Sequence, residues 1–404
     1  MSTVPREEID RRCVAVQAEL SQLASAGAEA PDALLVVQTA DLYYLSGTAQ
    51  QCHLLLPREG AARLLVRKVI ERAKDDSPLS DVHEMKSLRD LRGHIEALCG
   101  PPPWRIGMEL DVLPVSTFRA YQRALGDGVE IVDASRPILA ARSVKSDWEV
   151  DQLRAGSQLH EKVFGEVGSH LRDGVSTFDL QTLLDQRACA LGHCGIIRMR
   201  GLDVSIGIGA VVSGEDGAVP GHSMFPIGGK GPNSWVAGGG SRRPIDRDTP
   251  VIVDYLMSTS GYHADCTRMA VLGEFPEEAT ALLEKLSTLL RLAESQLKAG
   301  AIPSAIYANV LEAAKDAGLA SGFMGPEGYA VPFIGHSVGL EVNEAPVLAP
   351  KFDAPLVAGN TLAVEPKFTH PEFGVVGLEN TYLVTDDGFE NLSTASEDVI
   401  VCTP

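Results

Sequence analysis

Residues 251–273 read VIVDYLMSTSGYHADCTRMAVLG, two apolar, β-rich runs on either side of a Ser-Thr-Ser-Gly turn. The pattern predicts an antiparallel hairpin. Each run contains one aspartate, Asp254 or Asp265, where a buried strand favours an apolar side chain. If the turn is centred on Thr259 and Ser260, the aspartates face each other with Cβ atoms about 4.5–5.5 Å apart. Like charges placed in this way destabilise the strand pair, so a positive group between them is expected.

A divalent metal ion or a basic side chain could supply this positive charge. Arg268 lies in the second run, but strand alternation places it on the face opposite Asp265. Carboxylate oxygens are hard ligands, so a metal ion is the stronger candidate. The alternative is one aspartate at the turn and the other in a surface salt bridge.

Three further polar side chains lie in later apolar runs. His336 occurs in PFIGHSVGLEVNEAP (332–346), Glu365 ends the apolar run of TLAVEPKF (361–368), and Glu379 interrupts GVVGLENTYLVT (374–385). Buried glutamates are rare unless they are paired, whereas a lone histidine is often a core or capping residue. With the two aspartates, this set could hold two divalent ions about 3.5–4 Å apart.

These motifs resemble the metal-site motifs of the pita-bread metallopeptidases, a family that includes methionine aminopeptidase, prolidase, aminopeptidase P and creatinase. The resemblance rests on the order Asp, Asp, His, Glu, Glu and on the eleven-residue interval between the aspartates. The segments DLYYLSG (41–47), RIGMELD (105–111) and RSVKSDWEV (142–150) are similar to the amino-terminal domain and linker of the prolidase/creatinase branch.

The fold implied by this resemblance is α+β, with two domains. A smaller α/β creatinase/prolidase-type domain is expected over residues 1–145, followed by a pita-bread catalytic domain over residues 146–404. Short strands and helices alternate over the first 140 or so residues, as such a domain requires. Ser146 and Glu149 have the spacing of a capping box, which predicts that a long helix begins here.

The resemblance also implies the roles of the five polar residues. Two divalent ions, with manganese expected first and cobalt, iron or zinc as alternatives, would be bound by Asp254, Asp265, His336, Glu365 and Glu379. Asp265 and Glu379 would bridge the ions, and Glu365 would be both ligand and general base. The implied function is that of an Xaa-Pro dipeptidase or aminopeptidase, in which metal-bound hydroxide attacks an amide carbonyl.

The chain departs from the peptidase pattern at three positions. A histidine expected seven residues after the metal histidine is Asn343, and one expected about 17 residues before Asp254 is absent from SWVAGGGSRRP (234–244). An arginine expected two residues before Glu379 is Gly377. Asn343 could donate a hydrogen bond to an oxyanion, but an amide cannot shuttle a proton.

Five other side chains are candidates for the altered part of the site. His222 and His370 could replace the missing histidines, or both could be plain loop histidines. Arg242 and Arg243 could clamp a substrate carboxylate, or they could form a solvated basic turn. Tyr262 could line the substrate pocket or could simply pack in the core.

Two other functions remain open because of these departures. One is a non-peptidase pita-bread enzyme, such as a lyase or an amidinohydrolase, acting on a small charged metabolite. The other is a non-catalytic binding module similar to some histone-chaperone subunits. The intact set of five ligands counts against the binding module.

Composition limits the partners and the location. The 404 residues carry a formal net charge of −19, which argues against nucleic acid or an anionic membrane as a partner. Seven scattered cysteines without a Cys-x-x-Cys pair are typical of reduced thiols. The start MSTVPREEIDRRC lacks the apolar stretch of a signal peptide, and no apolar run has the length of a membrane span. We expect a cytoplasmic enzyme for a short peptide or small molecule, and the resemblance implies a homodimer.

Overall fold

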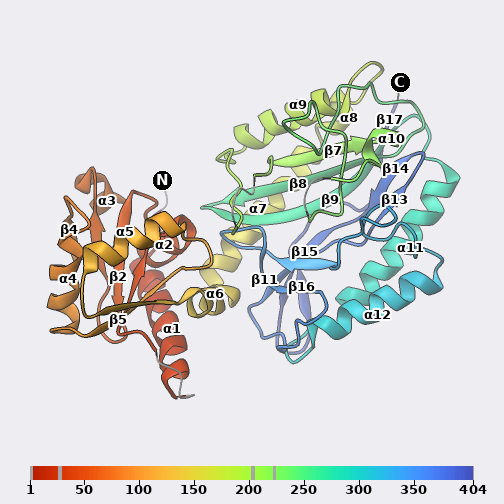
Figure 1. Ribbon diagram of the computed structural model, residues 1–404. Helices are drawn as coiled ribbons and strands as arrows, with labels where there is room; N and C mark the ends of the chain where they lie inside the picture. Colours follow the sequence, from red (N-terminus) through yellow and green to blue (C-terminus); the bar gives the residue numbers. More distant parts are fainter. Residues whose placement is uncertain (1–2, 26–29, 202–204, 222–223, 404) are drawn as a thin grey trace. The chain divides into compact units, whose positions relative to one another are not determined.

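The strands of the first third of the chain form one mixed sheet in the computed structural model, which describes residues 3–25, 30–201, 205–221 and 224–403 (Figure 1). The six strands lie in the order β4-β3-β2-β1-β5-β6. They are β1 (Ala33–Val36), β2 (Cys52–Pro57), β3 (Arg63–Val66), β4 (Val82–Glu84), β5 (Trp104–Met108) and β6 (Val129–Asp133). The helices are α1 (Arg6–Ser25), α2 (Thr39–Ser46), α3 (Ile70–Asp76), α4 (Asp90–Cys99), α5 (Val115–Leu125) and α6 (Ser135–Ser143).

The chain divides into two compact units, residues 1–142 with 200–204 and residues 143–199 with 205–404. In the second unit, one sheet has the order β17-β9-β8-β7 and another the order β11-β10-β12-β15-β16, while β13 and β14 form a separate pair. The strands are β7 (Gly209–Ser213), β8 (Val251–Thr259), β9 (Tyr262–Leu272), β10 (Gly335–Ser337), β11 (Glu344–Val347), β12 (Thr361–Val364), β13 (Lys367–His370), β14 (Gly374–Gly377), β15 (Asn380–Val384), β16 (Phe389–Asn391) and β17 (Ile400–Cys402). The helices are α7 (Asp147–Phe164), α8 (Val167–His170), α9 (Thr177–Ala190), α10 (Gly214–Gly217), α11 (Glu277–Glu294) and α12 (Pro303–Asp316).

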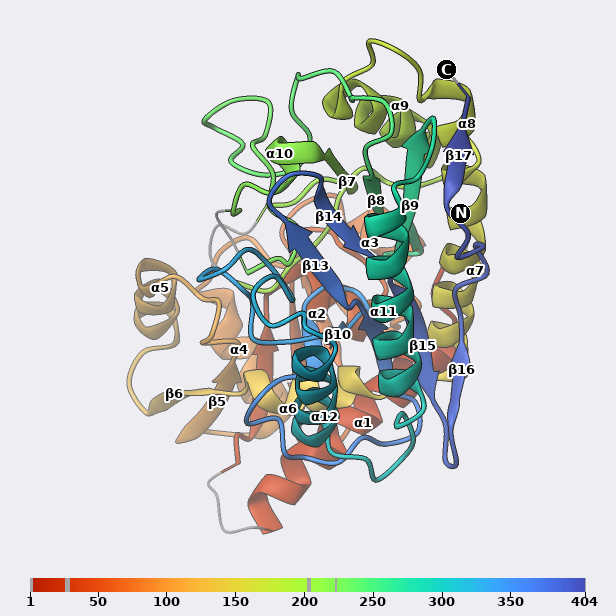
Figure 2. The ribbon, with the colours of Figure 1, turned by 90° about the vertical axis from the view of Figure 1, so that its right-hand side faces the viewer.

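Two apolar cores lie on opposite faces of the β7–β9 sheet. Val251, Val253 and Tyr255 of β8 pack in one core with residues of α7 to α9. Ile252 of β8 packs in the other core, with residues of α11, α12, β12, β14 and β15 (Figures 1 and 2). Because side chains alternate along a strand, Asp254 shares the face of Ile252. It therefore points toward the side of the sheet where β10 to β15 lie.

The β8–β9 hairpin has a register that differs from the predicted one. Asp254 lies opposite Thr267, and Asp265 lies opposite Leu256. The turn is centred on Ser260 and Gly261, whose φ angles are 52° and 85°. A two-residue hairpin turn of type I′ needs positive φ at both positions, and glycine adopts it without strain. The prediction that the aspartates face each other directly is wrong; they are diagonal neighbours on one face.

The amino terminus of α7 confirms the predicted capping box. The Ser146 hydroxyl accepts a hydrogen bond from the Glu149 backbone N–H at 3.2 Å, and the Glu149 carboxylate accepts one from the Ser146 N–H at 2.9 Å. All seven cysteines lie in the described part of the chain and are free. A search of the described helices finds none with the length and apolar character of a membrane span.

Candidate metal centre

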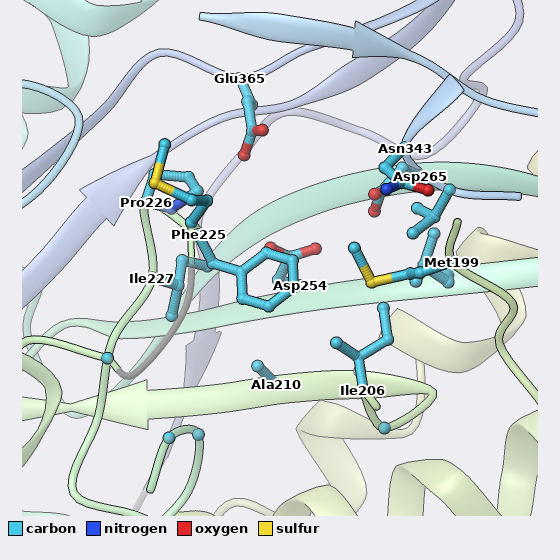
Figure 3. A pocket seen from close by; sticks show the side chains of 18 of the residues that line it. Met199, Ile206, Ala210, Phe225, Pro226, Ile227, Asp254, Asp265, Asn343 and Glu365 are labelled. Carbon is cyan, nitrogen blue, oxygen red and sulfur yellow. The ribbon is translucent and has the colours of Figure 1, made fainter. Parts of the chain in front are cut away.

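A cavity of about 470 Å³ opens beside the aspartate face of β8 and β9. Most of its wall is apolar, with side chains from several loops and strands: Met199, Ile206, Ile208, Ala210, Met224, Phe225, Pro226, Ile227, Val236, Leu256, Phe333, Val342 and Val347. The polar groups include Asp254, Asp265, His336, Asn343 and Glu365. Figure 3 shows carboxylates and the Asn343 side chain around the same space as the apolar side chains. Ionisable and polar side chains therefore line the same cavity as the apolar side chains.

Strand pairing places His336 beside Glu365. β10 pairs antiparallel with β12, so that His336 lies opposite Ala363. The Glu365 backbone N–H continues this ladder by donating to the carbonyl of Ile334 at 2.9 Å. As a result, His336 Nε2 lies 3.4 Å from Glu365 Oε1.

Glu379 is held against β9. Its backbone forms a bridge to Thr267, the residue opposite Asp254, and its Oε2 accepts a hydrogen bond from the Thr267 hydroxyl at 2.7 Å. Together with Asp265 and His336 it forms a group of three ligand atoms that all lie within 4.8 Å of one another. Residues that are separated by 114 positions in the chain thus share one small volume.

A lysine that sequence analysis did not single out lies among these carboxylates. Lys367 Nζ is 3.1 Å from Asp254 Oδ2 and 2.9 Å from Glu379 Oε2, and it also pairs with Glu365 Oε2. The residue is 1% exposed. Its only sequence signal is a position two residues after the predicted ligand Glu365, beside Pro366 and Phe368. A side chain two residues along an extended chain returns to the same face, which is how it reaches the site.

The electrostatics of the site indicate a need for more positive charge than Lys367 supplies. Burial and the neighbouring Glu379 and Asp254 carboxylates raise the pKa of Asp265 well above its ordinary value. Burial also raises the pKa of Glu379 to about 7, with the Glu365 and Asp254 carboxylates acting in the same direction against the Lys367 ammonium. Both Asp265 Oδ1 and Glu379 Oε1 are buried without a hydrogen-bond partner. Unpaired buried carboxylate oxygens beside an imidazole fit a divalent ion.

The other predicted site residues are placed as follows. Asn343 lines the cavity, whereas His222 lies outside the described residues. His370 is not among the lining residues; its ring stacks on Phe373 with 3.8 Å between centroids.

The predicted substrate-binding residues also lie away from the described cavity wall. The Arg242 guanidinium stacks on Phe178 at 4.8 Å from the ring centroid, and Arg243 pairs with Glu215 and Asp246. Tyr262 is 1% exposed and donates its hydroxyl proton to Glu149 at 2.7 Å. These contacts correspond to the basic turn and the core packing that were the alternatives for these residues.

The fold and the site together define a class, the metal-dependent hydrolases with a pita-bread domain and a creatinase-type amino-terminal domain. Residues 151–386 match the model of metallopeptidase family M24, and residues 22–144 match the creatinase/prolidase N-terminal domain. The chain belongs to metallopeptidase family M24, which confirms the resemblance, the fold class and the expectation of a peptidase-family enzyme. The family implies divalent metal ions.

Relatives of similar length carry peptidase names. The chain is 26% identical to the probable dipeptidase PepE of Mycobacterium tuberculosis, over 94% of this chain and 96% of that protein. It is 22% identical to an Xaa-Pro dipeptidase of Pyrococcus horikoshii, over 91% of this chain and 94% of that protein.

Solved structures share the fold over nearly the whole chain. The Xaa-Pro dipeptidase from Bacillus anthracis superimposes with a TM-score of 0.80 at 22% identity, covering 96% of this chain and 99% of that one. The N-terminal domain of the FACT complex subunit SPT16 from Eremothecium gossypii reaches 0.73 at 12% identity, covering 99% and 100%. Because such different proteins share the fold, function has to be argued from the site.

Proposed function

We propose that this chain is a metal-dependent peptidase that cleaves dipeptides, including Xaa-Pro dipeptides, or releases the amino-terminal residue of short peptides. The observation that carries the proposal is the pair of unpartnered, buried carboxylate oxygens of Asp265 and Glu379 beside His336, at the polar end of an apolar cavity. The dipeptidase names of the relatives support the substrate class.

Asp265, His336 and Glu379 would hold a divalent ion, and Asp254 and Glu365 complete the set that the family resemblance implies for two ions. Such an ion acts as a Lewis acid toward a carbonyl oxygen and lowers the pKa of a water molecule toward neutrality. Manganese, cobalt, iron and zinc all suit carboxylate and imidazole ligands, and manganese is the first to test.

The residues of the chain supply the other parts of the reaction. Glu365 lines the cavity and would take a proton from the attacking water and pass it to the leaving amine. The Asn343 amide would donate a hydrogen bond to the oxygen of the scissile carbonyl as negative charge develops there. The apolar wall would hold the side chains of the peptide and exclude water.

The composition of the wall favours peptides with apolar side chains over a substrate with acidic side groups. Among the described residues that line the cavity, none is a lysine or an arginine. An anionic side group would need a cationic partner when it leaves water, because an unpaired buried charge is costly. A volume of about 470 Å³ lies in the range of pockets for small ligands.

The test is a panel of dipeptides and short peptides with apolar and charged side chains, including Xaa-Pro dipeptides. The chain is stripped with a chelator and then reloaded with manganese, cobalt, iron(II) or zinc. We expect hydrolysis only after reloading, faster for apolar peptides, and lost in His336→Ala while His170→Ala retains it. Hydrolysis without any metal, or a metal-loaded chain that cleaves no peptide, would refute the proposal.

The cytoplasmic location and the homodimer stay predictions. Light scattering on the purified chain tests the oligomeric state.

A further inference from the structure

We propose that the ammonium group of Lys367 takes the place of one metal ion, so that this centre binds a single divalent ion beside a built-in cation. The inference rests on the proposed metal-dependent function and specifies the number of ions. The family resemblance implies two ions at the five predicted ligands, and Lys367 lies in the middle of that set.

The position of the Lys367 side-chain nitrogen supports this inference. Lys367 Nζ lies 3.1 Å from Asp254 Oδ2 and 2.9 Å from Glu379 Oε2, and it pairs with Glu365 Oε2 as well. An ammonium group has three N–H donors, and here it has three carboxylate partners. An ion bound by these same two oxygens would have to lie about 2.0–2.2 Å from each of them, in the space that the ammonium fills.

The ligand atoms that Lys367 does not contact support the inference as well. Asp265 Oδ1 and Glu379 Oε1 are buried carboxylate oxygens of this cluster without a hydrogen-bond partner, in residues that are 7% and 1% exposed. With His336 these two residues form the group whose ligand atoms lie within 4.8 Å of one another. Three protein ligands that leave positions open for water and substrate are typical of a catalytic mononuclear site.

Gly377 leaves room for the lysine side chain. Lys367 and Gly377 are direct partners in the β13–β14 pair. A Cβ atom at position 377 would lie 2.5 Å from Lys367 Cγ, so the side chain can cross there only because residue 377 is glycine. Position 377 is also where the family resemblance leads us to expect an arginine. The cation expected on one strand is therefore replaced by a cation on its partner, aimed at the metal ligands.

The balance of charge in the site is consistent with a single divalent ion. Four buried or half-buried carboxylates, those of Asp254, Asp265, Glu365 and Glu379, surround one ammonium group. Lysine alone leaves a formal excess of three negative charges in a site that is largely shielded from water, which is costly. One divalent ion reduces that excess to a single charge.

The test is the number of ions bound per chain, measured by elemental analysis and by calorimetric titration of the metal-free chain with Mn²⁺. We expect one ion in the wild-type chain and two in Lys367→Gly, which removes the ammonium and opens the second position. Lys351→Gly is the matched control, since Lys351 is exposed, with a φ of 72° that suits glycine, and one ion is expected. Two ions in the wild type, or one ion in a folded Lys367→Gly chain, would overturn the inference.

Electron paramagnetic resonance of the Mn²⁺-loaded wild-type chain decides the question even if Lys367→Gly does not fold. An isolated ion gives an uncoupled six-line signal, which supports the inference, and a spin-coupled pair contradicts it. A coupled pair with intact hydrolysis leaves the proposed function standing. A wild-type chain that binds no ion refutes the proposed function and the inference with it.

Discussion

Glu365 is the residue at which the apolar cavity meets the charged cluster. Burial works to raise the pKa of its carboxyl, but the Lys367 ammonium and the His336 imidazole outweigh burial and lower this pKa. The carboxylate is therefore ionised near neutral pH and is able to accept a proton while it faces the cavity. The same contacts hold the side chain in one orientation, which a proton acceptor needs.

Replacing Glu365 by glutamine keeps the shape of the side chain and removes its basicity. We expect kcat for dipeptide hydrolysis to fall by about 10²–10⁴-fold, the range for loss of a general base. Steady-state kinetics on the metal-loaded chain measure this loss, with circular dichroism to confirm folding. Glu372→Gln is the control, because Glu372 is exposed and does not line the cavity. Equal rates for the Glu365 variant and the wild type would exclude the assigned role.

The substitution Gly377→Ala tests the packing of Lys367 without changing a charge. In Gly377→Ala the added methyl would meet Lys367 Cγ at 2.5 Å, so the lysine or the β13–β14 pair must shift. We expect the free energy of unfolding to fall by about 1–3 kcal/mol, as for other overpacked sites. Urea unfolding measures it. Gly168→Ala should be neutral, since a Cβ there meets nothing within 4 Å, and a similar loss in both variants would contradict the explanation.

At the scale of the element, the β8–β9 hairpin holds both aspartates on one face. Its odd-numbered apolar side chains in β8 belong to one core and Ile252 to the other. A slip of one residue would exchange the two faces and bury the aspartates in the α7–α9 core. The two cores therefore fix the register more strongly than the turn does.

If the two cores fix the register, a substitution that strains the turn should lower stability without affecting function. Gly261→Ala places a side chain at a φ of 85° and should lower the free energy of unfolding by about 1 kcal/mol. Ser260→Asn should keep or raise stability, because Asn-Gly is the preferred type I′ pair. Urea unfolding and peptide hydrolysis are measured together. Loss of activity in a folded Gly261→Ala chain would show that the turn, and not the cores, sets the register.

For the whole molecule, buried histidines link stability to pH. Burial lowers the pKa of His160 to about 4; this residue of α7 forms a hydrogen bond with the Tyr255 carbonyl of β8 at 2.8 Å. In the unfolded chain this pKa is about 6.5. Between these values the unfolded chain binds the extra proton, so stability is complete above about pH 6.5 and is lost as the pH falls toward 4.

We expect this histidine to contribute a loss on the order of 3 kcal/mol across that window. The carboxylates with raised pKa values act in the opposite direction, so a comparison of two chains is needed to isolate the histidine. Urea unfolding at pH 7, 6 and 5 should show a smaller fall of stability with acid in His160→Phe than in the wild type. Parallel pH profiles for the two chains would contradict this account.

Much of the fold and part of the candidate site could be predicted from the residues. The capping box at Ser146 and Glu149 is local, and the order of the five polar residues in apolar strands is visible without any structure. The prediction that the two aspartates face each other was wrong, because the turn is centred on Ser260 and Gly261, one residue later than expected. Lys367 was missed, since its meaning depends on contacts with Asp254 and Glu379, 113 and 12 residues away in the chain.

The sequence by itself determined which side chains interrupt apolar strands, and so which residues had to meet a cation, because buried charge without a partner is too costly to keep. Only the tertiary structure showed that Asp254, Glu365 and Glu379 meet the Lys367 ammonium. Cross-strand pairing places Gly377 beside Lys367, and the pairing of β10 with β12 places His336 beside Glu365. Distances between residues far apart in the chain follow from packing of the two cores, and no local pattern contains that information.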